Sequence, residues 1–449
     1  MRPLTLALAL PLLVVLARAE TAQTPRAAQD TESRARAIVA ALVAGDFGKI
    51  ESQYDEQLAR ALPPGTLASS WATSASQLGP FDAIEGVQVQ TVGTNQVALA
   101  KCTFQHYSLT LRMVFNDNGQ LASLASLSPS PRGTWTPPDY GDPTTFEERS
   151  VTVTTGHFEL PGVLTLPKTN GPHPAVVLVH GSGPNDMDET FGPNKVFKDL
   201  AWGLATRGIA VLRYEKRSHK YGAQSADDPT ELTVKEEAMD DAHSAVVLLT
   251  TMPEIDPRRI FLVGHSLGAY LAPRIASGTP QIAGIILFAA NARPIEDLVV
   301  EQVRYEASLA GTVTPAIQKA IDGAEASAKE MRNPDLKKGT TVHLLNASLP
   351  ASYVLDLRTY HPTDVAAALS IPILVLQGER DYQVTMTDFG LWQKALAGHP
   401  KTTLKSYPGL NHFFIMGTGP ASPVEYTTPG HVDKAVVDEV ATWCKGQGT

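Results

Sequence analysis

Four near-continuous apolar runs constrain the fold of this chain more than any other feature. They are AVVLVH (175–180), RIFLVG (259–264), GIILFAA (284–290) and IPILVLQG (371–378). Runs of this kind suit strands that are buried on both faces of a sheet. Helical stretches lie between them, at 194–206, 233–250 and 267–276. Because strands that alternate with helices form a mostly parallel sheet, the pattern predicts a doubly wound α/β domain.

The preceding part of the chain has a different pattern. Residues 32–78 have a helical period, residues 85–127 alternate between apolar and polar, and NDNG (116–119) is typical of a hairpin turn. We therefore expect a small α+β domain at 30–127. Prolines and glycines are frequent in the next segment, which predicts a linker at 128–147 and places the α/β domain at 148–449.

The first nineteen residues have the pattern of a secretory signal peptide. MRPLTLALALPLLVVLARA carries Arg2, then an apolar stretch, then the small-x-small cleavage pattern of residues 17–19. An uncleaved anchor is the weaker alternative, because Pro11 interrupts the apolar run and no cysteine follows to accept a lipid. We expect a secreted or periplasmic protein with no membrane span after cleavage.

Charge and cysteine content limit the classes of partner. The formal net charge is −9, and the chain has no run of lysine and arginine that could bind nucleic acid or an anionic membrane surface. The only two cysteines, Cys102 and Cys444, fall in different predicted domains. Two buried free thiols are favoured, although export would permit a disulfide between them.

Ser266 has the sequence context of a nucleophile. It lies in VGHSLGAY, where the RIFLVG strand turns sharply into a helix. Such a turn needs Gly264 and Gly268 at positions where a Cβ would clash, and it lifts the serine hydroxyl above the sheet. A serine hydroxyl attacks only when a base removes its proton and a carboxylate orients that base.

The carboxylate that orients the base is expected to follow a later strand. Asp381 follows the strand end at Gly378 by three residues and is the preferred acid. Glu379 lies close to the same strand end, and Asp388 is expected within the next helix, so these two are the alternatives.

The histidine that acts as the base is expected in a loop near the C-terminus. His412, in the turn LNHFF, is the preferred base. The alternatives are His399, at a helix end before Pro400, and His431, which is expected to open the last helix. Both have the simpler interpretation of surface residues.

Two backbone amides are candidates for the oxyanion hole. Leu267 N–H lies at a helix start, where the helix dipole assists. Ser182 N–H lies in HGSG (180–183), which follows the first buried strand. His180 and His265 are interpreted as scaffold residues rather than catalytic ones.

The order Ser266, Asp381, His412, with HGSG upstream, resembles the α/β-hydrolase superfamily. HGSGPNDMDE (180–189) and the segment 194–217 are similar to bacterial serine esterases related to dienelactone hydrolases and prolyl-oligopeptidase-type peptidases. The resemblance covers about 148–445. It implies carboxylesterase activity on acyl esters without a cofactor or metal. The N-terminal domain looks similar to nuclear transport factor 2-like folds.

Residues 291–368 intervene between two core strands and predict a helical cap over the site. Tyr353 and Tyr360 are candidates for contact with substrate, although packing is the commoner fate of a tyrosine. Because the cap is only modestly apolar, we expect acetyl to butyryl esters to be preferred over long acyl chains.

The acidic cluster Asp186, Asp188 and Glu189 has two interpretations. It could bind a cation, but pairing with Arg213 or Arg217 is favoured, and such pairs would brace the loop that follows HGSG.

The sequence therefore predicts a serine hydrolase of short-chain esters, with a small-molecule or carbohydrate-linked acyl ester as its partner. A peptidase, amidase or thioesterase on the same scaffold is the alternative. A binding protein on an inactive scaffold is disfavoured, because all three catalytic residue types are present. Nothing in the sequence specifies the oligomeric state.

Overall fold

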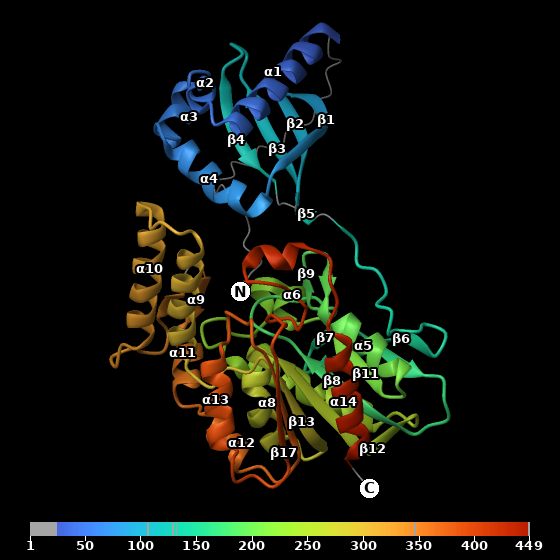
Figure 1. Cartoon of the computed structure of the whole chain (residues 1–449). Coiled ribbons are helices and arrows are strands. Elements are labelled where there is room, and N and C mark those ends of the chain that lie inside the picture. The colour runs from blue at the N-terminus through green and yellow to red at the C-terminus, as the bar shows by residue number, and fades with distance from the viewer. Residues whose placement is uncertain (1–24, 106, 128–129, 132, 345–346, 448–449) are drawn as a thin grey trace. The chain divides into compact units, whose positions relative to one another are not determined.

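A computed structural model describes residues 25–447 except 106, 128–129, 132 and 345–346 (Figure 1). The predicted signal peptide, residues 1–19, lies outside the described residues. The chain divides into two compact units, with the division between Thr134 and Trp135. Among the described helices, none has the length and apolar character needed to cross a membrane.

The described residues of the N-terminal unit form four helices and an antiparallel sheet, as predicted (Figure 1). Its sheet has the order β1-β2-β3-β4, with β5 paired to β3. Alternate residues of β2, from Ala98 to Phe104, face the core, and Cys102 is a buried free thiol among them. The elements are α1 (Pro25–Ala44), α2 (Phe47–Glu51), α3 (Glu56–Ala61), α4 (Thr66–Leu78), β1 (Phe81–Val92), β2 (Asn95–Phe104), β3 (Tyr107–Phe115), β4 (Leu121–Ser126) and β5 (Ser130–Pro131).

The second unit is built on an eight-stranded sheet of order β17-β16-β13-β12-β8-β11-β7-β6. The six strands from β17 to β11 are parallel to their neighbours, and β7 and β6 add an antiparallel edge. This topology confirms the predicted α/β fold. The strands are β6 (Phe146–Thr155), β7 (Phe158–Pro167), β8 (His173–Val179), β11 (Ala210–Tyr214), β12 (Ile255–His265), β13 (Ile282–Phe288), β16 (Ile373–Gly378) and β17 (Thr402–Tyr407).

Helices flank this sheet, and the four predicted apolar runs form β8, β12, β13 and β16 (Figure 1). The stretch predicted as a helix at 233–250 begins as a π-helix, η2 (Lys235–Met239). Cys444 is a second buried free thiol, in the last helix. The flanking elements include α5 (Val196–Thr206), α6 (Arg217–Tyr221), η1 (Gly222–Gln224), α7 (Asp240–Thr250), α8 (Leu267–Gly278), α13 (Met386–Ala395), η3 (Pro423–Thr427) and α14 (Lys434–Gly446), and a short ribbon pairs β9 (Thr190–Phe191) with β10 (Asn194–Lys195).

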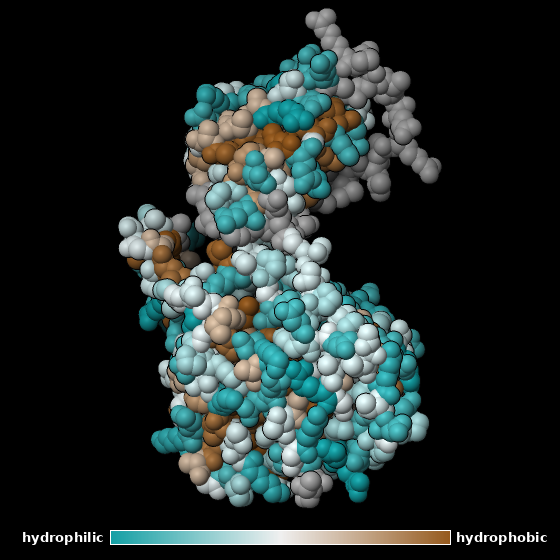
Figure 2. All heavy atoms as spheres, turned by 45° about the vertical axis from the view of Figure 1, so that its right-hand side comes forward, coloured by the Kyte–Doolittle hydropathy of each residue, from teal (hydrophilic) through white to brown (hydrophobic). Residues whose placement is uncertain are grey.

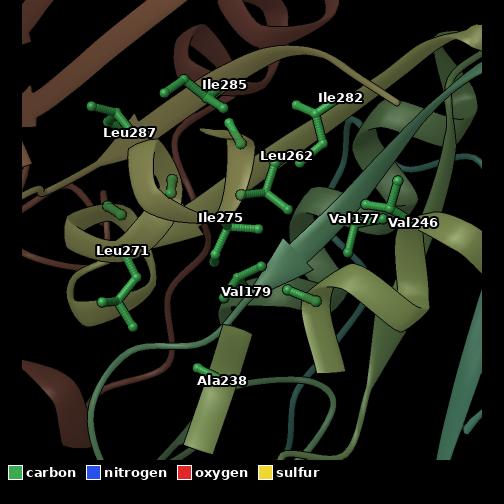
Figure 3. Packing of buried hydrophobic residues seen from close by; sticks show 14 of the residues in the cluster. Val177, Val179, Ala238, Val246, Leu262, Leu271, Ile275, Ile282, Ile285 and Leu287 are labelled. Carbon is green, nitrogen blue, oxygen red and sulfur yellow. The ribbon is translucent and has the colours of Figure 1, made fainter. Parts of the chain in front are cut away.

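The core lies where α7 and α8 pack on the central strands. Figure 3 shows Val177 and Val179 of β8 with Leu262 of β12 and with Leu271 and Ile275 of α8, all of them buried. Burial of one such side chain contributes about 1.5–3 kcal/mol to folding. This packing fixes the ends of β8 and β12, where the candidate site residues lie.

The predicted linker at 128–147 is too long at its C-terminal end. Trp135 packs edge-on against Trp202 with ring centroids 5.1 Å apart, and its Nε1 donates to Asp199 Oδ1 at 2.7 Å. Tyr140 OH donates to Val432 O at 2.6 Å. Aromatic side chains in the Pro-rich segment therefore anchor it to the second unit from Trp135 onward.

The segment predicted as a cap is mostly helical. α9 and α10 pack side by side (Figure 1), and a small core of Met331, Val342, Ala351 and Val354 joins α10 to the following elements. A β-hairpin, which the sequence analysis did not predict, follows α10. The elements are α9 (Ile295–Leu309), α10 (Pro315–Met331), β14 (Thr341–Leu344), β15 (Ala347–Pro350), α11 (Ala351–Arg358) and α12 (Pro362–Ala367).

The surface of the second unit is mainly hydrophilic on the face drawn in Figure 2, where apolar patches are separated by polar side chains. The exposed large apolar side chains of this unit include Val247, Leu391 and Met416, which belong to different elements. Scattered apolar residues of this kind are normal on a soluble protein.

We predict that residues 133–449 fold as an independent unit, whereas a chain that begins at residue 142 is less stable. The shorter chain lacks Trp135 and Tyr140, so it should lose about 2 kcal/mol and melt roughly 4–8 °C lower. Thermal unfolding of both proteins followed by circular dichroism tests this. Equal melting temperatures would place the boundary after residue 142.

Candidate active site

The predicted site residues follow neighbouring parallel strands. Ser266 follows β12, the HGSG loop (180–183) follows β8, Asp381 follows β16, and His412 follows β17. Carboxyl ends of parallel strands meet at one edge of the sheet, where α/β proteins usually bind ligands. The topology therefore brings the four predicted segments to the same edge.

Ser266 occupies a strained turn. Its backbone has φ 53° and ψ −115°, and it is half-buried between neighbours that are fully buried. A Cβ on Gly264 would lie 2.3 Å from the carbonyl of Gly268, and a Cβ on Gly268 would lie 2.1 Å from Val179 O. Only glycine fits these two positions, because a Cβ would overlap backbone atoms. Both glycines thus have the role that the sequence motif predicts.

Asp381 and His412 form a buried pair. His412 Nδ1 lies 2.7 Å from Asp381 Oδ2, and the two side chains are 3% and 0% exposed. Asp381 Oδ1 accepts the N–H groups of Gln383 and Val384 at 2.8 and 3.0 Å. The carboxylate is therefore fixed from its own loop while it orients the imidazole.

A catalytic triad also needs a hydrogen bond between its serine and its histidine. Among the described residues, Ser266 Oγ and His412 Nε2 do not share a hydrogen bond. The two segments are nevertheless held together, because His265 Nε2 lies 3.0 Å from His412 O and the two rings are 4.7 Å apart. Catalytic hydrogen bonds often tighten only when substrate binds.

The alternative acids and bases have other partners. Glu379 accepts from Ser406 Oγ at 2.7 Å at the surface, and Asp388 accepts the N–H groups of Ala292 and Arg293. His399 Nε2 lies 2.8 Å from Leu369 O, and His431 pairs with Asp199 at 3.1 Å. None of the four is joined to the Asp381–His412 pair by a hydrogen bond among the described residues.

The two predicted oxyanion donors lie in suitable backbone. Leu267 is the first residue of α8, where helix N–H groups have no partner within the helix. In the HGSG loop, Gly181 N–H already donates to Glu189 Oε1 at 2.7 Å, whereas the described residues provide no acceptor for Ser182 N–H. A Cβ on Gly181 would lie 3.2 Å from Ser266 Cβ, so this loop lies directly against Ser266.

A buried ion pair that the sequence analysis missed lies beneath Ser266. Glu189 Oε2 lies 3.0 Å from His265 Nδ1, and both residues are buried. His412 O only accepts, so His265 Nε2 carries a proton, and Nδ1 faces a carboxylate oxygen that needs a second proton between them. The two groups share this second proton, and the directions of their pKa shifts favour an imidazolium beside a carboxylate.

The pKa directions agree with this charge state. Burial alone would lower the pKa of His265, but the Glu189 carboxylate, the His412 carbonyl and Asp381 together outweigh it and raise that pKa. Burial alone would raise the pKa of Glu189, but His265 and the Gly181 N–H together lower it. The pair holds the residue before Ser266 and the loop of His412 in one arrangement.

His180 is a neutral scaffold residue. Its ring packs against Phe197 and Tyr214 with centroids 5.0 and 5.6 Å away, and its Nε2 lies 3.0 Å from Asp186 O. Burial lowers the pKa of His180 to about 4, despite the opposing effect of Glu189.

The acidic cluster is braced by cations. Asp188 pairs with Arg213 at 2.8 Å and with Lys195 at 2.7 Å, in keeping with the preferred interpretation. Asp186 accepts from Thr190 Oγ1 at 2.7 Å within its own loop. The other predicted partner, Arg217, pairs with Asp241 instead, because α6 carries it toward α7.

The predicted substrate contacts of Tyr353 and Tyr360 need correction. Both side chains lie in the main hydrophobic core, at 5% and 7% exposure. Tyr353 OH donates to Glu237 Oε2 at 2.6 Å, and Tyr360 OH donates to Tyr270 O at 2.8 Å. Their hydroxyls are committed to the protein, so both are packing residues.

Strained backbone is concentrated around these loops. The described non-glycine residues with positive φ are Glu189, Ser266, Ala289 and Phe414. Ala289 follows Phe288, whose carbonyl accepts Ser266 N–H at 2.9 Å, and Phe414 follows His412 by two residues. Such strain persists at functional sites, where the surrounding structure over-determines it.

Comparison with known proteins identifies the family. Residues 176–425 match the Alpha/beta hydrolase family. Esterase EstD of Thermotoga maritima is 37% identical over 413 residues, which cover 90% of this chain and 92% of EstD. The chain belongs to the alpha/beta hydrolase family.

The N-terminal unit of this hydrolase also matches a family. Residues 35–124 match a protein family of unknown function, DUF3887. The resemblance to nuclear transport factor 2-like folds stays a prediction.

Comparison with solved structures found two esterases at low sequence identity. Est1E from Butyrivibrio proteoclasticus is 17% identical with a TM-score of 0.43, and it covers 66% of this chain and 98% of its own. The Pyrococcus furiosus esterase Pf2001 is 18% identical with a TM-score of 0.44, covering 70% and 95%.

Sequence reasoning did not assign Lys216, and it expected an arginine rather than His265 as the partner of Glu189. Lys216 Nζ donates to Gly181 O at 2.8 Å. A signal was present, since Lys216 follows the short apolar run of β11 by two residues and so lies at the functional edge of the sheet. The partner of Glu189 depends on the path of its loop, which no spacing rule reveals.

We predict that Gly268→Ala destabilises this hydrolase severely, because the new Cβ would meet Val179 O at 2.1 Å. The loss should exceed about 3 kcal/mol in denaturant unfolding, if the variant folds at all. Gly278→Ala is the matched control in the same helix, since a Cβ there meets nothing within 4 Å. Equal stability of the two variants would contradict the close approach of α8 to β8.

We also predict that His180 makes the hydrolase acid-sensitive. Below pH 6.5 the unfolded imidazole takes up a proton that the folded one refuses until about pH 4, so protonation favours unfolding. The stability advantage of wild type over His180→Gln should shrink as pH falls from 6.5 to 4.5, by up to about 1.4 kcal/mol per pH unit. Urea unfolding at several pH values measures this.

The exposed residue His157, substituted by glutamine, controls for the loss of one histidine. A wild-type advantage over His180→Gln that stays constant across this range would mean that His180 is not buried in neutral form.

Proposed function

We propose that this hydrolase cleaves short-chain carboxylic esters through a Ser-His-Asp triad of Ser266, His412 and Asp381. The chain is an esterase on an α/β-hydrolase scaffold, by its 37% identity to esterase EstD over 90% of its length. One observation carries the finer proposal. The buried His412–Asp381 hydrogen bond of 2.7 Å lies at the sheet edge where the strained turn presents Ser266.

The residues suggest a two-step reaction. His412 Nε2 removes the proton of Ser266 Oγ, which attacks the ester carbonyl, and the proton then passes to the leaving alcohol. Water attacks the acyl-enzyme by the same route and releases the acid. Asp381 holds the imidazole in the required tautomer and stabilises its positive charge. The amides of Leu267 and Ser182 receive the oxyanion in each step.

The preference for short acyl chains rests on polar contacts of the cap. Gln302 of α9 donates to Gln383 O at 2.9 Å, and Tyr305 stacks on Tyr382 with centroids 5.1 Å apart. Both partners lie within two residues of Asp381, so α9 presents an amide and a phenol ring, rather than aliphatic side chains, beside the acid loop. Each additional buried methylene of a substrate contributes only about 0.8 kcal/mol, and only against an apolar wall.

We further propose that the substrate is met outside the cytoplasm, as a small-molecule or carbohydrate-linked ester. This rests on the signal-peptide pattern of residues 1–19 alone. An N-terminal sequence of the mature protein that still begins at Met1 would contradict it.

We predict that Ser266→Ala lowers kcat for nitrophenyl acetate by about 10⁵-fold or more, with the fold intact. His412→Ala should be nearly as damaging. Asp381→Asn should cost somewhat less, because serine and histidine remain. Glu379→Gln is the matched control at the same strand end, and a loss there equal to that of Asp381→Asn would transfer the acid role.

A substrate panel tests the ester preference. Acetyl to butyryl nitrophenyl esters should have the highest kcat/KM, and matched aminoacyl anilides should be slower by orders of magnitude. An amine leaves only after proton delivery, which requires a firmly held leaving side. Values of kcat/KM that rise steadily to C12, or that favour the anilide, would overturn the proposal.

A further inference from the structure

The peptide group between Gly181 and Ser182 is held by buried side chains. Gly181 O accepts from Lys216 Nζ at 2.8 Å and from Asn185 Nδ2 at 3.2 Å. The Lys216 side chain is only 3% exposed. A buried ammonium group is expensive to desolvate, so its position against one carbonyl oxygen calls for an explanation beyond packing.

The carbonyl of Gly181 and the N–H of Ser182 belong to one planar trans peptide unit. Their bonds point in opposite directions, so a donor that fixes the carbonyl also fixes the direction of the N–H. A cation on the carbonyl oxygen also withdraws electron density from the amide and makes its N–H a stronger donor. Lys216 Nζ therefore binds the carbonyl edge of the peptide, opposite the edge that carries Ser182 N–H.

We propose that Lys216 is a positioning residue for the oxyanion hole, which aims and polarises Ser182 N–H through the Gly181–Ser182 peptide. The inference rests on the proposed function, because it takes Ser182 N–H as an oxyanion donor. Lys216 itself touches neither substrate nor reacting atoms.

A chain of short contacts connects Lys216 to the cap. Lys216 Nζ lies 2.6 Å from Glu237 Oε1, and Tyr353 OH of α11 donates to Glu237 Oε2 at 2.6 Å. Burial alone would raise the pKa of Glu237, but Lys216 and the Tyr353 hydroxyl lower it, so the carboxylate stays ionised. Ser352, which precedes Tyr353 in the sequence, donates to the carbonyls of Thr230 and Leu232 at 3.1 and 2.9 Å.

Two features favour positioning over simple bracing. Glu237 lies in the π-helix η2, a rare element that is frequent at functional sites. The cavity beside Lys216 and Glu237 has a volume of only about 10 Å³, so the ammonium has little freedom to leave Gly181 O. Through the contacts Tyr353–Glu237–Lys216, the direction of Ser182 N–H therefore depends on the position of α11.

The test compares variants of the full chain. Lys216→Met with Glu237→Gln removes both charges of the pair, so no buried charge stays unpaired. Tyr353→Phe removes the cap contact alone. Tyr360→Phe is the matched control, because it removes a buried cap hydroxyl that bonds to Tyr270 O and has no part in this chain.

Four quantities are measured for each variant: kcat and KM for nitrophenyl acetate, the inhibition constant of a trifluoromethyl ketone, and the melting temperature. The ketone forms a tetrahedral oxyanion adduct with a nucleophilic serine, so its affinity reports the oxyanion hole. For the double variant we expect kcat about 30–100-fold lower, KM within about threefold of wild type, and the inhibition constant raised in proportion to the loss in kcat. Tyr353→Phe should lower kcat about 3–10-fold, and Tyr360→Phe less than twofold.

The outcomes separate this inference from the proposed function. Labelling of wild type by a fluorophosphonate at Ser266 shows that the nucleophile assignment stands. If Ser266 is labelled and the folded double variant keeps kcat and ketone affinity within twofold, the role of Lys216 is overturned. If Ser266 is not labelled, the proposed function fails first. If the double variant does not fold, Tyr353→Phe and Tyr360→Phe decide, and equal values for these two overturn the proposal.

Discussion

The close approach of α8 to the end of β8 is the constraint on which the site depends. Gly268 lies so near Val179 that a Cβ would come within 2.1 Å of the carbonyl oxygen. This contact forces the chain to reverse between β12 and α8 within one residue. Ser266 is that residue, and its positive φ and half-exposed side chain follow from the packing of glycine against backbone.

Around this turn, side chains hold the backbone in place, whereas hydrogen bonds between strands hold it within the sheet. At the site, buried polar and charged side chains hold the loops after β8, β16 and β17. Glu189 binds Gly181 N–H and faces His265, whose Nε2 faces His412 O. Asp381 is fixed by its own loop and orients His412. Removal of one member of such a network leaves another buried charge unpaired, which is strongly destabilising.

The sequence predicts the sheet and the Ser266 turn well, because both depend on local patterns. Apolar runs mark β8, β12, β13 and β16, and the glycine spacing marks the turn. The edge strands β6 and β7 were missed because their burial is uneven, so no continuous apolar run marks them. Tyr353 and Glu237 were not paired, because their contact joins segments more than a hundred residues apart, whose meeting depends on the fold.

The proposed mechanism requires Ser266 to form a covalent acyl intermediate at the edge of this sheet. Rapid quenching of the enzyme with nitrophenyl acetate in acid, followed by peptide mass spectrometry, tests it most directly. This mechanism requires an acetyl group on the peptide that contains Ser266. If deacylation is slow in Asp381→Asn, that variant should accumulate the acetylated peptide in near-stoichiometric amount. Turnover without any acylated Ser266 peptide, or an acetyl group that accumulates on another residue at the rate of turnover, would contradict it.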